Sequence, residues 1–193
     1  ATIIEASLLD LSEQEMAAHV KGCDAVASCL GHVPTFKGVF GEPRKLCTDA
    51  VRRLSQAIEA NQPSRPVKFV LMNTVGVGNA DLDEARSAFD RGLLFLIRHL
   101  VPAHRDNETA VEHLRGHVGV DSKSVEWCSV RPDSLINADV SAYDIVKSPV
   151  TSILSGRPTT RSNVAQFMAA LIDDADLWAK WRFKMPVIMN SGN

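Results

Sequence analysis

Strand-like and helix-like segments alternate along the chain, and this alternation restricts the fold more than any other feature. Short apolar or β-branched stretches predict strands at 2–10, 24–30, 67–74, 125–132, 143–149 and 185–190. Helical spacing of apolar residues predicts helices at 10–22, 44–61, 83–100, 105–117 and 162–174. Such alternation is typical of a parallel sheet covered by helices on both faces. We therefore expect a three-layer α/β fold.

Length, charge and cysteine usage narrow the class of protein. A length of 193 residues with a net charge of −2 predicts a single domain, and argues against nucleic-acid or membrane-surface partners. The four cysteines show no CxxC spacing, so we expect reduced thiols and no metal site. His113 and His117 have ligand spacing on a helix, but no third ligand is indicated. Because the amino end lacks the pattern of a signal peptide, we expect a cytoplasmic protein.

Polar or small residues follow three of the predicted strands. These strand ends are Asp10, the stretch Ser28 to Gly31, and the pair Asn73 and Thr74. In open α/β sheets, ligands bind beyond the carboxyl ends of the strands, near the point where the strand order reverses. We therefore expect the ligand at this edge of the sheet.

Several segments resemble, in their order, the atypical short-chain dehydrogenase/reductases, which are NAD(P)-binding Rossmann proteins. Residues 7–31 (SLLDLSEQEMAAHVKGCDAVASCLG) resemble the third strand, the next helix and the fourth strand of that family. Residues 70–79 (VLMNTVGVGN) resemble its fifth strand and the turn after it. The segments 110–116, 125–137 and 159–174 resemble later parts of the same fold, so the resemblance covers nearly the whole chain.

The resemblance implies a cofactor, NAD or NADP, and a set of residues around it. The implied cofactor-binding residues are Asp10, Leu11, Ser28, Cys29, Leu30, Gly31, Asn73, Arg131 and Pro132. Asp10 would accept a hydrogen bond from the adenine amine, and the small residues after the fourth strand would lie along the ribose. Thr74 matches the hydroxyl residue that polarises a substrate carbonyl, because a hydroxyl can donate to a developing oxyanion.

The first departure from the family is a missing phosphate loop. The family begins with a strand, a Gly-rich loop and a helix, and that loop holds the pyrophosphate. The only Gly pair before a predicted helix lies at 76–85, after the fifth strand, and fits better as part of the active-site turn. We expect a fragment of a longer protein that binds the dinucleotide weakly. Its bare sheet edge would favour a homo-oligomer.

The second departure concerns the family's Tyr-x-x-x-Lys pair. The only tyrosine, Tyr143, lies far downstream, and the two positions fall near His104 and Glu108. A histidine can donate a proton, and we therefore predict His104 as a catalytic residue beside Thr74. A glutamate cannot replace the lysine, because it offers no cation to the ribose hydroxyls.

The function that these patterns favour is hydride transfer between NAD(P) and a small carbonyl or alkene substrate. Two alternatives stay open: a non-catalytic dinucleotide sensor, and a structural or partner-binding fragment without cofactor affinity. The simpler interpretations are a helix-start histidine at His104, a strand end at Asp10 and an ordinary turn residue at Thr74. The apolar stretch 91–100 favours a core helix over a partner-binding one.

Overall fold

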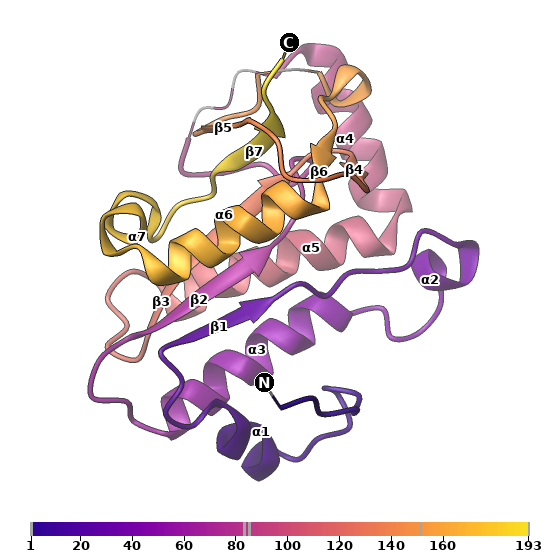
Figure 1. Ribbon diagram of the computed structural model, residues 1–193. Helices are drawn as coiled ribbons and strands as arrows, with labels where there is room; N and C mark the ends of the chain where they lie inside the picture. Colours follow the sequence, from indigo (N-terminus) through magenta and orange to yellow (C-terminus); the bar gives the residue numbers. More distant parts are fainter. Residues whose placement is uncertain (1, 83, 85, 151, 193) are drawn as a thin grey trace.

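A five-stranded sheet forms the centre of the computed structural model, which describes residues 2–82, 84, 86–150 and 152–192 (Figure 1). The strands, in spatial order, are β1 (Ala25–Ser28), β2 (Val67–Met72), β3 (Val125–Pro132), β7 (Val187–Asn190) and β5 (Tyr143–Val146). The first four are parallel and β5 is antiparallel to β7. The predicted α/β class with a mainly parallel sheet is confirmed.

The register of the three central strands brings their carboxyl ends to one edge. Ser28 of β1 lies opposite Leu71 of β2, which in turn lies opposite Ser129 of β3. The backbone N–H of Asn73 donates to the carbonyl of Val130 at 2.8 Å, so the pairing continues past the end of β2. The turns that follow β1 and β2 therefore leave the sheet side by side.

One face of the sheet is covered by α1 (Glu13–Val20), α3 (Leu46–Ala60) and α5 (Pro102–Glu112), which continues into the π-helical turn η1 (His113–Val118). Ser12 and Glu15 form the predicted capping box of α1, with the Ser12 N–H donating to Glu15 Oε2 at 2.8 Å. The core on this face includes Val51, Ile58, Phe69, Leu114 and Trp127. Right-handed crossovers from β1 to β2 and from β2 to β3 place α3 and α5 on this face and start both helices at the carboxyl edge.

The opposite face is covered by α6 (Arg161–Asp173) and α7 (Ala175–Trp181), which Figure 1 shows lying across β2 and β3. Its core includes Val70, Val130, Phe167, Trp178 and Ile188. The indole N–H of Trp178 donates to Glu126 Oε2 at 2.6 Å, which ties α7 to β3. The remaining elements are α2 (Phe36–Phe40), α4 (Ala88–Leu100), η2 (Ile153–Ser155) and the pair of β4 (Leu135–Ile136) with β6 (Thr159–Thr160).

The strand predicted at 2–10 is wrong. These residues are irregular and end in a turn, and Ile3 is 92% exposed. A strand outside a sheet leaves its backbone groups unpaired, whereas here Leu8 and Leu11 pack against the core beside α1 and α3. As a result β1, not this segment, forms the edge of the sheet.

The expectation of a core helix at 91–100 is also wrong. Asp90 is the one buried residue of α4 in the described part of the chain, and Phe89, Phe95, Leu96 and Leu100 are each more than half exposed. The helix forms as its apolar spacing predicts, but its large apolar side chains are mostly exposed and are not part of the core.

Among the described residues, no helix combines the length and the apolar character that a membrane span requires. All four cysteines are free thiols, as their spacing predicts.

Candidate active site

The turn after β2 brings Thr74 and His104 to the same place. Thr74 Oγ1 accepts the backbone N–H of Gly76 at 3.3 Å. A β-carbon on Gly76 would lie 3.3 Å from His104 Cε1 and 3.8 Å from Thr74 Oγ1. The two predicted catalytic side chains therefore lie close to the same residue, Gly76, where an added β-carbon would crowd the His104 ring.

His104 lies in the first turn of α5, close to two arginines and a glutamate. Its Nε2 is 3.6 Å from Glu108 Oε1, one helical turn on. Burial lowers the pKa of His104; Glu108 opposes this, while the charges of Arg98 and Arg86 lower it further. The net shift is downward, so the imidazole is mostly uncharged at neutral pH.

Asn73 fixes the turn to α5 and keeps Thr74 in place. Its side-chain Nδ2 donates to the carbonyl of Asn107 at 3.0 Å, and its Oδ1 accepts the Thr74 N–H at 2.8 Å. Both ends of this buried amide are thus used within the protein. The geometry makes Asn73 a positioning residue for Thr74, although the family resemblance implies a cofactor contact.

A charged cavity of about 430 Å³ adjoins this turn. Its walls come from Gly76–Ala80, α4 and α5, and its charged lining residues are Glu84, Arg86, Arg91, Arg98, Glu108 and Glu112. Arg86 Nη2 donates to the carbonyl of Val75 at 2.8 Å, which holds the cavity wall against the turn. Arg98 Nε lies 3.0 Å from Glu108 Oε2, so Glu108 lies between Arg98 and His104.

The end of β1 has the features that a ribose contact requires. Ser28 is 4% exposed, and its Oγ has no hydrogen-bond partner among the described residues. Cys29 and Gly31 are exposed, and a β-carbon on Gly31 would meet no atom within 4 Å. A buried hydroxyl without a partner beside an open glycine fits a polar ligand. These residues therefore suit one end of a dinucleotide, while no Gly-rich phosphate loop occurs in the sequence.

The loop after β1 is tied to α5 by Asp106, which the sequence reasoning missed. His32 Nε2 lies 2.8 Å from Asp106 Oδ2, and His32 Nδ1 lies 3.1 Å from the carbonyl of Gly38. The same carboxylate accepts the backbone N–H groups of Cys47 at 2.8 Å and Thr48 at 2.9 Å. It therefore caps the N-terminus of α3, where Lys45 provides no side-chain cap.

The charge of Asp106 is stabilised by these contacts. Burial raises the pKa of its carboxyl, but the hydrogen bonds from Thr48, His32 and Cys47 outweigh it, so the net shift is downward. Burial and the adjacent carboxylate raise the pKa of the Cys47 thiol to about 12. His32, Cys47 and Asp106 lie close enough to hold a metal ion, but a protonated thiol and a carboxylate bound by amides favour a capping network over a metal site.

Arg131 and Pro132 are buried at the end of β3. The Arg131 guanidinium donates to the carbonyls of Met185 at 2.9 Å, Val77 at 2.9 Å and Lys147 at 3.2 Å, and it pairs with Glu84 at 2.8 Å. Burial lowers the pKa of this guanidinium, and Glu84 opposes the shift. The donors of Arg131 thus bind acceptors within the protein, and its bond to the Val77 carbonyl stabilises the turn after β2.

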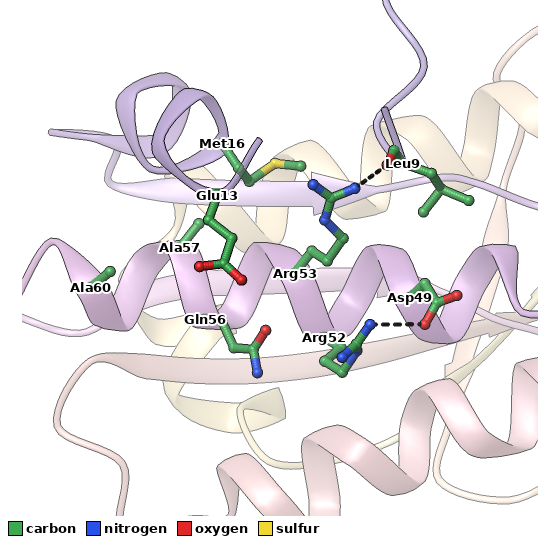
Figure 2. Close-up of a pocket in the computed structure, with 9 residues that line it drawn as sticks. All are labelled: Leu9, Glu13, Met16, Asp49, Arg52, Arg53, Gln56, Ala57 and Ala60. Carbon is green, nitrogen blue, oxygen red and sulfur yellow. Dashed lines mark hydrogen bonds and ion pairs between the residues drawn. The ribbon is translucent and has the colours of Figure 1, made fainter. Parts of the chain in front are cut away.

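Asp10 and Leu11 lie apart from this site. The guanidinium of Arg53, midway along α3, donates to the carbonyls of Leu8, Leu9 and Leu11 and so anchors their turn. Figure 2 shows this arginine beside Leu9, in a cavity of about 560 Å³ between α1 and α3. None of the predicted site residues lines that cavity. The turn follows no strand of the sheet, and the structure does not bring it together with Thr74 and His104.

The mainly parallel sheet, its helical layers and the polar turns at its carboxyl edge define a Rossmann-like protein of the dinucleotide-binding class. A family model described as NAD(P)H-binding matches residues 1–175. The chain belongs to this family.

Solved structures of low sequence identity share the fold. The oxidoreductase ylbE from Lactococcus lactis is 16% identical to this chain, with a TM-score of 0.65. The alignment covers 100% of this chain and 73% of the ylbE chain. A wide-type short-chain dehydrogenase/reductase from Veillonella parvula, in complex with NADP, is 12% identical with a TM-score of 0.64, covering 99% and 73%. ChuY, an anaerobillin reductase from Escherichia coli, is 14% identical with a TM-score of 0.61, covering 97% and 74%. No curated protein matches the chain.

Proposed function

We propose that the protein is an NAD(P)H-dependent oxidoreductase that reduces a small carbonyl or alkene, or catalyses the reverse reaction. The observation that supports this most directly is the meeting of Thr74 and His104 beside Gly76 at the carboxyl edge of the sheet. A hydroxyl can stabilise the developing oxyanion and an imidazole can donate the proton, which are two roles that carbonyl reduction uses.

The cofactor would lie along Ser28, Cys29, Leu30 and Gly31. When bound, NAD(P)H supplies the hydride. Thr74 donates a hydrogen bond to the substrate oxygen, which develops negative charge, and His104 in its protonated form gives that oxygen a proton. The substrate oxygen would thus take its proton from His104 as the carbonyl is reduced to an alcohol, and solvent would reprotonate the neutral imidazole. Glu108 stabilises the protonated form of His104 from one turn away.

Cofactor titration and turnover separate this proposal from its alternatives. Calorimetry with NADH and NADPH tests binding, and oxidation of each cofactor with aldehydes, ketones and quinones tests turnover. Binding without turnover would favour the dinucleotide sensor. No binding at millimolar cofactor would exclude both the enzyme and the sensor, leaving a structural or partner-binding role.

The cytoplasmic location and the partners are part of the same proposal. Free cysteines and a net charge of −2 support a cytoplasmic protein with a small-molecule substrate and no nucleic-acid or membrane partner. The outer side of β1 has no neighbouring strand among the described residues, which supports a homo-oligomer formed through this edge. Sedimentation at several protein concentrations tests the last point.

Replacing Thr74 with alanine is expected to lower kcat by about 10²–10³-fold, the usual loss for one oxyanion donor. Thr74→Ser keeps the hydroxyl and should retain most of the activity. Steady-state rates with a saturating aldehyde measure the effect. Equal activity of Thr74→Ala and the native protein would remove this hydroxyl from the reaction.

The rate of carbonyl reduction is expected to rise as the pH falls from 8 to 6. The pKa of His104 is lowered from 6.5, so the protonated, proton-donating form is the minor one above pH 6.5. In that range the fraction of protonated His104 increases about tenfold for each unit by which the pH falls. His104→Gln should lose this dependence and react slowly at every pH. A pH profile of kcat/KM that stays the same in the variant would assign the proton donor to another group.

A further inference from the structure

A second cavity, of about 550 Å³, lies where α3 and α5 begin. Five of the residues that line it carry basic side chains, and we call it the basic groove: Arg44, Lys45, Arg98, His99 and Arg105. They come from three separate parts of the chain: the segment before α3, the end of α4 and the first turns of α5. Figure 1 shows α3 and α5 side by side. Since both helices start at the carboxyl edge of the sheet, the groove that their first residues line lies at that edge.

The positive charge of the groove is only partly compensated. Among the described residues, the one acidic residue that lines the groove is Asp106, whose carboxylate already binds two backbone N–H groups and His32. Arg44 pairs with Glu42, and Arg98 with Glu108. In the described part of the chain, Lys45 and Arg105 have no ion-pair partner and are exposed. The groove therefore presents two free cations to a ligand.

The groove is connected to the active site through Arg98. This arginine lines both the basic groove and the cavity beside Gly76. Its partner Glu108 contacts His104. A molecule whose charged end lies in the basic groove and whose reactive end lies at Gly76 would pass Arg98, which lines both cavities.

We propose that the basic groove binds the anionic end of the substrate, so that the enzyme acts on a carbonyl compound bearing a carboxylate or phosphate group. The proposal rests on the proposed function and adds the substrate class to it. Lys45 supplies a compact charge, while Arg105 supplies a planar pair of donors that matches two oxygens of a carboxylate or phosphate. The cavity beside Gly76 receives the carbonyl end.

The test compares 4-formylbenzoate with benzaldehyde, which differ only in the anionic group. The expected result is a kcat/KM about tenfold or more higher for the acid, as a charge-assisted hydrogen bond provides. Lys45→Gln and Arg105→Gln should each lower this ratio by about tenfold, and Arg105→Lys should lose less. The matched control is Lys123→Gln. Lys123 is exposed and lies just before β3, at the amino ends of the strands, so this variant should leave the ratio unchanged.

Calorimetric titration of the cofactor-free protein with 4-formylbenzoate distinguishes the possible failures. Binding that weakens in Lys45→Gln, without turnover of either aldehyde, would support the groove as an anion site and overturn the reductase activity. Turnover of both aldehydes with a ratio that no groove variant changes would overturn the groove and leave the activity standing. A loss of NADPH affinity in Lys45→Gln with an unchanged ratio would assign the groove to the cofactor phosphates and overturn the substrate proposal.

Discussion

Replacing Arg131 with methionine is expected to lower the free energy of unfolding by about 3–5 kcal/mol, the usual cost of removing one partner of a buried ion pair. The Arg131 side chain is fully buried and binds three carbonyls in addition to Glu84. Methionine fills similar space but leaves those carbonyls without this donor, and the Glu84 carboxylate keeps only its pair with Arg86 at 3.3 Å. Urea unfolding followed by tryptophan fluorescence measures the change.

The matched control is Arg182→Met. Arg182 is half exposed and also pairs with a glutamate, Glu126, and a surface pair of this kind contributes only about 0–1 kcal/mol. The double variant Arg131→Met, Glu84→Gln should recover part of the loss, because it removes a buried carboxylate charge that Arg86 alone would otherwise balance. If Arg131→Met proves as stable as Arg182→Met, the buried guanidinium does not hold the turn after β2.

Replacing Asp106 with alanine is expected to cost about 3 kcal/mol or more, because hydrogen bonds to a charged group are worth about 1.5–3 kcal/mol each. The variant leaves the N–H groups of Cys47 and Thr48 uncapped and detaches His32 from α5. It should also weaken cofactor binding, since the loop after β1 loses its anchor. Chemical unfolding and cofactor titration measure the two effects.

The effect of Asp106 should depend on pH in a defined direction. Its pKa is lower in the folded state than in the unfolded state, so its stabilising contribution is present above about pH 4. It is lost as the pH falls through the folded-state pKa, and the unfolding free energies of native protein and variant should converge there. Asp49→Ala, which removes a carboxylate from the first turn of the same helix α3, is the control. A constant difference down to pH 2 would show that the charge of Asp106 contributes nothing.

Local patterns predicted most of the elements because their causes are local. The capping box at Ser12 and the apolar stripe of α3 depend on residues three or four positions apart, so they can be found in the sequence. The segment 2–10 has the composition of a strand, but a strand also needs a neighbour. Whether a strand has a neighbour depends on the tertiary structure, and residues 2–10 have none, so they form an irregular segment that ends in a turn.

The residues of the candidate site could be predicted from the sequence only where they follow a predicted strand. Thr74 and the residues after β1 follow from the rule that ligands bind at the carboxyl edge. The pairing of Asp106 with His32 could not be predicted, because the two residues are 74 positions apart and neither belongs to a recognisable motif. Arg131 has a charged side chain at the end of a buried strand, and its burial depends on acceptors from three distant segments that spacing does not reveal.

The contacts of α5 imply that two parts of the site open together. Asn107 holds Asn73, whose amide binds the Thr74 N–H, and the adjacent Asp106 binds the N–H of Thr48. A displacement of α5 would break the bonds of Asn107 to Asn73 and of Asp106 to Thr48 in a single event, and the released Asn73 side chain would no longer be held as the acceptor of the Thr74 N–H. The amide hydrogens of Thr48 and Thr74 should therefore exchange with solvent deuterium at matched rates, as members of one cooperative unit, although they lie on opposite sides of β2 in the sequence.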